Sequence, residues 1–108
     1  SYDTSNNPLI VSTTSRSLGV PHMISIRKIK NGAINLWING TAEGGASTDT
    51  TTSYSTNNID LFIGRRGNGA NYMDGYIGEI IIFDRALSTQ ERQDIETYLS
   101  KKWKITIP

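Results

Sequence analysis

The sequence predicts an all-β protein: an antiparallel β-sheet followed by one short C-terminal α-helix. Among the 108 residues 15 are Ile, a β-branched residue that favours strands. Over residues 34–39 the aliphatic residues Ile34, Leu36 and Ile38 alternate with Asn35, Trp37 and Asn39, which is the period-two pattern of a half-buried strand. Near the C-terminus, Ser88 precedes Glu91 by three residues and so matches the capping box that starts a helix. These three observations define the expected fold class.

Strands are expected where apolar stretches are bounded by turn residues. Asn31 with Gly32, and Asn39 with Gly40, should form tight hairpin turns because Asn and Gly accept positive φ. Residues 75–84 are apolar on both faces at their centre, so we expect this strand in the middle of the sheet with cover on each side. The expected strands are residues 8–14, 22–29, 34–38, 59–63 and 75–84, with residues 50–56 as a polar edge strand.

The C-terminal helix is expected to begin after Ser88, its N-cap residue. Its acidic residues lie towards the N-terminal end and its lysines towards the C-terminal end, as the helix dipole favours. A narrow apolar stripe should dock the helix on the sheet. The stripe consists of Ile95, Tyr98, Leu99 and Lys102 with its neighbour Trp103.

Composition limits the function classes. The net charge is +1, and no basic run is longer than a pair, so a nucleic-acid partner is not expected. The longest apolar run, residues 80–83, is too short to span a bilayer. The absence of Cys excludes a disulfide framework and a thiol nucleophile. Ser, Thr and Asn supply 32 residues, a polar uncharged surface typical of extracellular or virion β-proteins.

Three segments, in this order, resemble the concanavalin A-like superfamily and specifically its laminin G-like (LamG-like) jelly-roll members. Residues 33–40 (AINLWING) are similar to a family strand that ends in a V-N-G turn. Residues 59–64 (IDLFIG), a Gly- and Asn-rich loop and residues 74–80 (DGYIGEI) are similar to the pattern F-x-G-x-I-x-E-I. Residues 83–91 (FDRALSTQE), continuing to YLSKKW, are similar to the Y-N-R-A-L-S-x-x-E tail of bacterial and phage members.

This resemblance covers about residues 22–104 and implies a concanavalin A-like β-sandwich or jelly roll with a C-terminal helix. We interpret residues 1–108 as a single domain that matches the C-terminal part of a larger jelly roll. A full jelly roll needs more strands than this sequence supplies. Either N-terminal strands lie outside the sequence, or a partner chain provides them, or the module is a reduced version.

The resemblance also implies a function. It favours a non-catalytic module that binds a carbohydrate or another cell-surface ligand at an extracellular or virion surface. The alternative is a structural or assembly module, such as a phage tail-fibre, decoration or adhesin component, whose open sheet is completed by other protein subunits. Exposed strand edges and a bare apolar face would accompany that alternative.

Glycosidases share the jelly-roll architecture, so Glu79 and Asp84 are candidate catalytic carboxylates. Five residues of strand would separate them by about 16 Å and place them on opposite faces. Glycosidase pairs need about 5–9.5 Å on one side of a cleft. The E-x-D-x-x-E pattern is also absent. We therefore predict no enzyme activity, and expect Glu79 to pair with a neighbouring Arg and Asp84 to order the turn into the helix.

The candidate ligand-binding residues lie in the loop that follows Gly64. This loop joins two expected strands, whereas a phosphate-cradling loop opens a helix. Sugars are held by directional hydrogen bonds together with stacking on an aromatic face. Trp37, opposite the aliphatic face of its strand, could also stack a sugar, cover the sheet or meet another subunit. The predicted ligand-binding residues are Arg65, Arg66, Asn68, Asn71, Tyr72 and Trp37.

Three further features carry simpler interpretations. His22, the single histidine, has no second ligand at metal spacing and no local catalytic partners, so we expect a strand-end residue. Asn39, Gly40 and Thr41 match the N-glycosylation pattern, but the hairpin turn explains them without a glycan. Relatives bind calcium, yet the scattered aspartates form no ligand pattern; no cofactor is predicted, and calcium is left open. Those aspartates are Asp49, Asp60 and Asp74.

Overall fold

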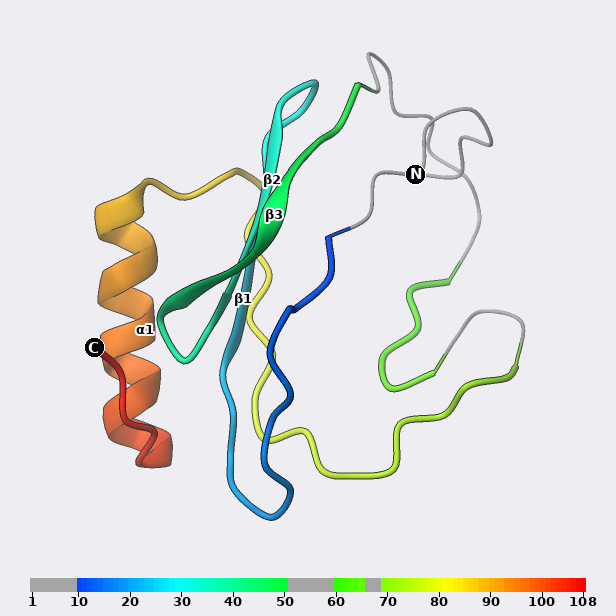
Figure 1. Cartoon of the computed structure of the whole chain (residues 1–108), viewed down its shortest axis with the longest axis vertical. Helices are drawn as coiled ribbons and strands as arrows, with labels where there is room; N and C mark the ends of the chain where they lie inside the picture. Colours follow the sequence, from blue (N-terminus) through cyan, green and yellow to red (C-terminus); the bar gives the residue numbers. More distant parts are fainter. Residues whose placement is uncertain (1–9, 51–59, 66–68) are drawn as a thin grey trace.

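The structure, a computed structural model, describes residues 10–50, 60–65 and 69–108. In this part of the chain it contains three strands, β1 (Ile24–Lys28), β2 (Ala33–Ile38) and β3 (Thr41–Thr48), and the helix α1 (Thr89–Trp103). The strands form one antiparallel sheet in the order β1-β2-β3. The helix packs beside the sheet, and a short non-helical segment, residues 104–108, follows it (Figure 1). An antiparallel sheet with one short C-terminal helix is therefore confirmed.

Two hairpin turns fix the strand register. Asn39 and Gly40 alone connect β2 to β3, with φ of 50° and 78°, and Ile38 then faces Thr41 across the ladder. Two consecutive residues of positive φ are typical of the type I′ turn, whose twist matches the flanking strands. Four residues connect β1 to β2, and among them Asn31 has a φ of 50°. Both predicted turns are confirmed, although in the first only Asn31 adopts positive φ.

Strand β3 lies where the sequence predicted none. Its residues, TAEGGAST, are small or polar. It forms because the Asn39–Gly40 turn folds the chain back onto β2, and ladder hydrogen bonds need no particular side chain. Gly44 has a φ of 71°, and a Cβ there would lie 2.6 Å from the Val11 carbonyl oxygen. The expected edge strand at residues 50–56 falls outside the described residues except for Thr50, which lies beyond the end of β3.

Different segments cover the two faces of the sheet. Ile34, Leu36 and Ile38 line one face and are buried, as their alternation predicts. Residues 12–16 cross this face at β3, where the Ser12 hydroxyl donates to the Glu43 carboxylate over 3.2 Å. Helix α1 covers the opposite face (Figure 1). The core is therefore a single sheet between a helix and an N-terminal segment.

The aliphatic face is left bare at β1. Ile24 and Ile26 face the same side as their cross-strand partners Ile38 and Leu36. Both are nevertheless strongly exposed, and Ile26 is 67% accessible. The cover over this face thus ends at β2.

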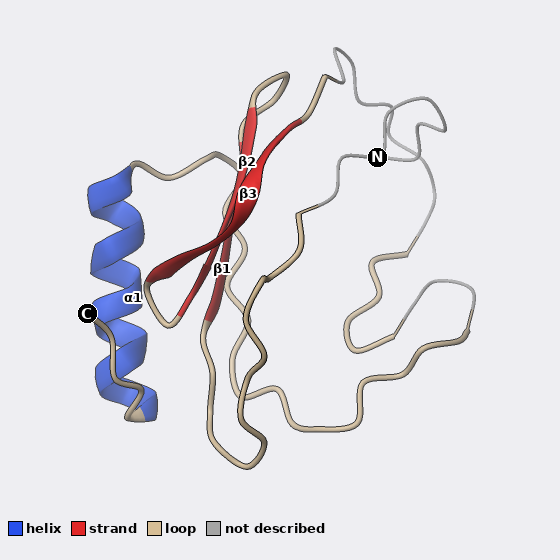
Figure 2. Ribbon diagram, viewed as in Figure 1, coloured by secondary structure: helices blue, strands red, loops and turns tan. Residues whose placement is uncertain are grey.

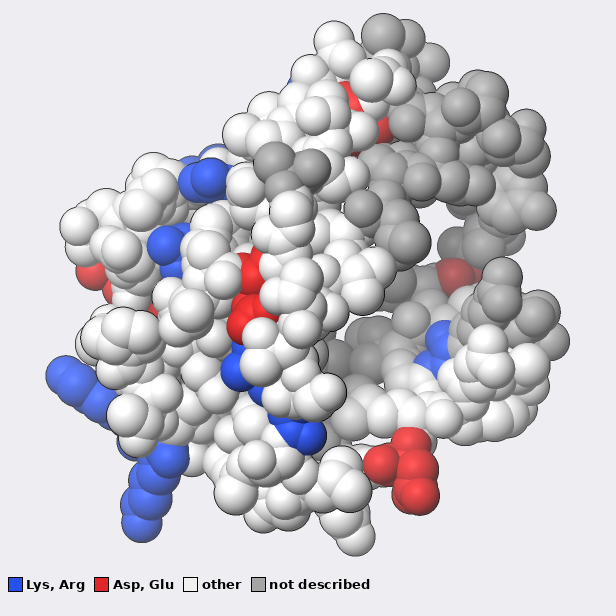
Figure 3. All heavy atoms as spheres, in the orientation of Figure 1, with Lys and Arg blue, Asp and Glu red and all other residues white. Residues whose placement is uncertain are grey.

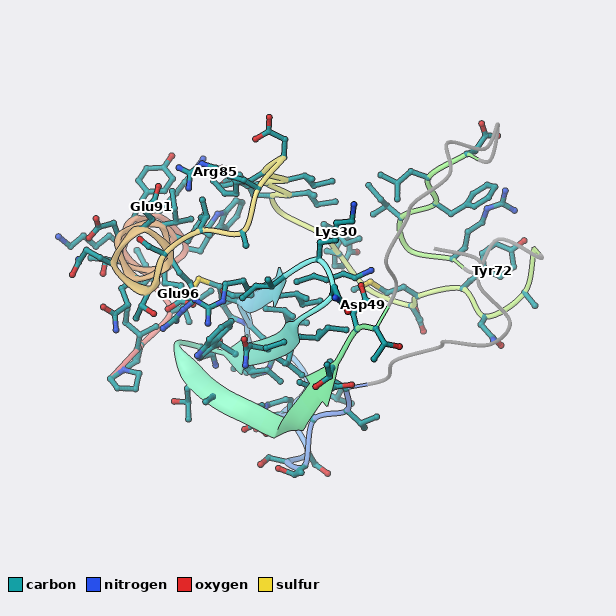
Figure 4. All side chains as sticks on the ribbon, turned by 90° about the horizontal axis from the view of Figure 1, so that it is seen from above. Lys30, Asp49, Tyr72, Arg85, Glu91 and Glu96 are labelled. Atoms are coloured by element: carbon teal, nitrogen blue, oxygen red, sulfur yellow. The ribbon has the colours of Figure 1, made fainter. Side chains whose placement is uncertain are left out.

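The prediction of a central strand at residues 75–84 is wrong. These residues form a loop that runs along the β1 side of the sheet (Figures 1 and 4), and all of them are exposed. No backbone hydrogen bond between described residues joins them to a strand. An apolar run makes a central strand only with strands on both edges and cover on both faces, and the described residues provide neither. Residues 10–14 and 60–63, also expected in strands, lie in loops as well (Figure 2).

Local sequence starts α1 as predicted. The Ser88 hydroxyl accepts from the Glu91 N–H, and the Glu91 carboxylate accepts from the Ser88 N–H, each over 3.1 Å. This is the reciprocal capping box, which satisfies two otherwise unpaired N–H groups. At the other end Lys104 is left-handed, with a φ of 54°, and its N–H donates to the Ser100 carbonyl.

The capping residue Glu91 makes the helix start sensitive to acid. Its ion pair with Arg85, assisted by the Ser88 N–H, lowers the pKa of the Glu91 carboxyl from 4.5 to about 2. Because the folded pKa lies below the unfolded one, the stabilisation is present above the unfolded pKa and is lost as the pH falls towards about 2. We expect Glu91→Gln to flatten the fall in stability across this window, as measured by urea unfolding at each pH. Asp94→Asn, on the same helix, is the control, and identical pH profiles for Glu91→Gln and the native chain would contradict the assignment.

The surface that α1 buries differs from the predicted apolar stripe. Tyr98 and Trp103 are exposed, and Ile95 and Leu99 are only half-buried. The most buried residue of α1 is instead Glu96, at 2% exposure. The contact between the helix and the sheet is therefore built around a charged residue, which an apolar stripe does not predict.

Arg92 makes this contact between the helix and the sheet. Arg92 Nη1 lies 2.6 Å from both carboxylate oxygens of Glu96, and the Arg92 guanidinium carbon lies 4.0 Å from the centre of the Trp37 ring. Arg27 lies over the same ring at 5.3 Å. A guanidinium can lie on an indole face and still donate in its plane to a carboxylate, so one side chain satisfies both neighbours.

Candidate functional site

One backbone hydrogen bond joins Gly64 and Met73, the two ends of the candidate loop at residues 64–73, of which the structure describes 64, 65 and 69–73. The Met73 N–H donates to the Gly64 carbonyl over 2.7 Å. Gly64, Gly69 and Asn71 have φ of 77°, 78° and 57°, which allows the chain to reverse within few residues. Arg65 and Tyr72 are the first residues inside the two ends of this closed loop. The closure therefore places the backbones of Arg65 and Tyr72 next to each other at the base of the loop.

Arg65 is held by an aromatic ring. Its guanidinium carbon lies 4.2 Å from the centre of the Phe62 ring, and Phe62 is half-buried. A Cβ on Gly69 would lie 3.9 Å from Arg65 Nη1, so the side chain extends towards the far part of the loop. Stacking on one face of the guanidinium leaves its in-plane N–H groups able to donate.

Tyr72 supplies an accessible aromatic face. It is 69% exposed and lies on the part of the molecule farthest from α1 (Figure 4). Asn71, beside it, is exposed as well. An exposed phenol ring with a neighbouring amide can combine stacking with directional hydrogen bonds.

The loop brings together three of the six predicted ligand-binding residues: Arg65, Asn71 and Tyr72. Arg66 and Asn68 lie outside the described residues. Trp37 lies elsewhere, on β2, where it is 9% exposed beneath Arg92. This position fits a side chain that covers the sheet, since the Trp37 ring is not presented to a ligand. Phe62 as the platform for Arg65 is not predicted from the sequence, because residues 59–63 are expected to form a strand.

Glu79 links the C-terminal end of α1 to the loop of residues 75–84. Its Oε2 accepts from the Trp103 indole N–H over 2.9 Å and lies 3.0 Å from Lys102 Nζ. A Cβ on Gly78 would lie 2.8 Å from the Trp103 ring, so the ring packs directly on this backbone. The prediction that Glu79 pairs with an Arg is wrong. The C-terminal end of α1 packs against this segment, so the partners of Glu79 are Lys102 and Trp103. The Trp103 and Lys102 donors lower the pKa of Glu79, whereas a catalytic general acid needs a raised one.

His22 and Asn39 hold the hairpin end of the sheet together. Asn39 Oδ1 accepts from the Met23 N–H over 2.8 Å, and Asn39 Nδ2 lies 3.3 Å from His22 Nδ1. His22 Nε2 lies 2.9 Å from the Ser17 carbonyl oxygen. Both ends of the Asn39 amide are therefore engaged, which fits a turn residue better than a glycan attachment site.

Charged side chains are dispersed. Acidic and basic groups are scattered over the visible face of the described residues rather than gathered into a field of one sign (Figure 3). Asp49 is fully buried, 3.0 Å from Lys28 Nζ. Within residues 10–50, 60–65 and 69–108, no three His, Cys, Asp or Glu side chains lie close enough to hold a metal ion. In the same ranges no helix has the length and apolar character needed to cross a membrane.

The fold and the loop together define a small β-sheet module with an exposed polar and aromatic loop. A family model described as the concanavalin A-like lectin/glucanases superfamily, of laminin G type, matches residues 4–91, and the chain belongs to this family. The match includes the sheet, the loop of residues 64–73 and the start of α1. Laminin G-like domains are generally non-catalytic binding modules and are often extracellular. No curated protein and no solved structure matches the chain.

Proposed function

We propose that this protein is a non-catalytic module that binds a carbohydrate or another cell-surface ligand through the loop of residues 64–73. The observation that carries the proposal is the closed loop with stacked Arg65 at one end and exposed Tyr72 at the other. A sugar presents hydroxyls at its rim and an apolar face, and this pair of side chains complements both. Membership of a family of binding modules supports binding over catalysis.

The proposal includes the setting of the module. We place it at an extracellular or virion surface, in keeping with its polar composition of 32 Ser, Thr and Asn residues. We propose binding without a metal cofactor, with protein donors alone holding the ligand. Arg66 and Asn68, next to Arg65 in the sequence, are proposed to add donors to the same rim.

A glycan array tests this function. The chain is applied in calcium and again in chelator, and we expect the same glycans to bind in both conditions. Tyr72→Ala should weaken binding about tenfold or more, because it removes the stacking face. Tyr76→Ala is the matched control, since Tyr76 is fully exposed but lies outside the loop. A blank array from a folded sample would contradict the proposal, and binding only in calcium would contradict its metal-free form.

A second function, assembly with other subunits, is favoured by the exposed apolar side chains. Ile24 and Ile26 on β1, and Ile80 and Ile82 beside the sheet, are open to solvent. A partner chain that added strands would cover them, as expected for a tail-fibre, decoration or adhesin component. A blank array combined with concentration-dependent oligomers in sedimentation would favour this function, whereas a monomer at all concentrations that binds glycans would exclude self-assembly.

A further inference from the structure

Arg65 differs from the other arginines that the structure describes. Arg27 donates to the Asn35 side chain and the Leu87 carbonyl. Within residues 10–50, 60–65 and 69–108, no carboxylate forms an ion pair with Arg65, whose contact is the Phe62 ring. The remaining three arginines are paired with glutamates, as Arg16–Glu43, Arg85–Glu91 and Arg92–Glu96.

The position of this guanidinium suits an external anion. Its stack on Phe62 restricts the side chain before any ligand arrives, which lowers the entropy lost on binding. Its planar fork of N–H donors matches a planar carboxylate in a two-point contact. Hydrogen bonds to a charged acceptor are about twice as strong as those to a neutral hydroxyl. The ligand group opposite Arg65 is therefore expected to be anionic.

Tyr72 indicates what bears the anion. The Met73–Gly64 hydrogen bond brings the two ends of the loop together, so Arg65 and exposed Tyr72 occupy neighbouring positions of the backbone and one ligand can reach both side chains. We infer that the loop binds an acidic glycan, one whose sugar ring carries a carboxylate. This inference rests on the proposed function and adds the ligand class. The carboxylate pairs with Arg65 while the ring stacks on Tyr72.

Paired oligosaccharides test the ligand class. The probes are oligogalacturonate, oligoglucuronate and sialyl-lactose, each with its neutral parent, together with a sulfated galactose oligomer. Affinities are measured by calorimetry in chelator. We expect at least one carboxylated probe to bind about 10- to 100-fold more tightly than its neutral parent, which is the range for a hydrogen bond to a charged group. The sulfated oligomer should bind more weakly than that probe.

Variants assign the preference to Arg65. Arg65→Gln should remove the preference for the acidic probe and leave the affinity for the neutral parent nearly unchanged. Lys101→Gln, an exposed residue of α1, makes the same change in net charge and should preserve the preference. Circular dichroism confirms that both variants fold.

The outcomes separate this inference from the proposed function. Equal binding of acidic and neutral probes would overturn the carboxylate assignment while the binding function stands. Equal or tighter binding of the sulfated oligomer would overturn the specificity for carboxylate. A loss of the preference in Lys101→Gln would attribute it to net charge and overturn the role of Arg65. If the chain binds neither these probes nor any glycan on the array, both the proposed function and the proposed ligand class are contradicted.

Discussion

Replacing Trp37 with Ala is expected to lower the free energy of unfolding by about 3–5 kcal/mol, the usual range for truncating a buried large aromatic residue. Trp37 is 9% exposed between the sheet and α1. Its ring carries Arg92 at 4.0 Å and Arg27 at 5.3 Å, so truncation removes the packing and leaves two guanidinium groups without their aromatic contact. Urea unfolding followed by circular dichroism measures the change.

Two comparisons sharpen this test. Trp37→Phe keeps an aromatic face under Arg92 and should lose less stability than Trp37→Ala. Tyr72→Ala removes an exposed ring and should change stability by only about 0.5 kcal/mol. If Trp37→Ala kept its stability and instead lost glycan binding, Trp37 would be a ligand-stacking residue and the helix–sheet contact described above would not hold.

Replacing Glu96 with Ala is expected to destabilise the chain by about 3–5 kcal/mol, because it leaves the buried charge of Arg92 without its partner. The Arg92 and Glu96 side chains are only 11% and 3% exposed, and Arg92 Nη1 lies 2.6 Å from both Glu96 oxygens. The effect should appear as a lower urea midpoint with little change in slope.

Asp94→Ala is the matched control, since Asp94 is an exposed acidic residue of the same helix. The double variant Arg92→Met with Glu96→Leu removes both charges and should be more stable than Glu96→Ala alone, because no charge is left unpaired. A midpoint for Glu96→Ala equal to that of Asp94→Ala would show that the pair contributes nothing to the docking of α1.

Features that depend on neighbouring residues could be predicted from the sequence. The type I′ turn at Asn39 and Gly40, and the capping box of Ser88 and Glu91, involve residues at most three positions apart. Alternation correctly identified the buried aliphatic face of β2. Both turns and the helix start followed from local backbone preferences and hydrogen-bonding capacity, which act whatever the rest of the chain does.

Features that depend on distant segments could not be predicted from the sequence. Residues 75–84 have the composition of a central strand, but a strand also requires a hydrogen-bonded neighbour, and composition does not say whether one is present. β3 has the composition of a loop, yet the preceding turn pairs it with β2. The Arg92–Glu96 spacing is a common surface pair on a helix, and its burial arises only because Trp37 lies opposite.

The candidate site divides in the same way. That Arg65, Asn71 and Tyr72 share one Gly-rich loop could be predicted from the sequence, because it follows from their order along the chain and from the residues that break strands. Three further relations became visible in the folded chain: Phe62 supports Arg65, the Gly64–Met73 hydrogen bond closes the loop, and Trp37 lies beneath α1. Those three relations are contacts through space, set by how the segments pack, and no local preference encodes them.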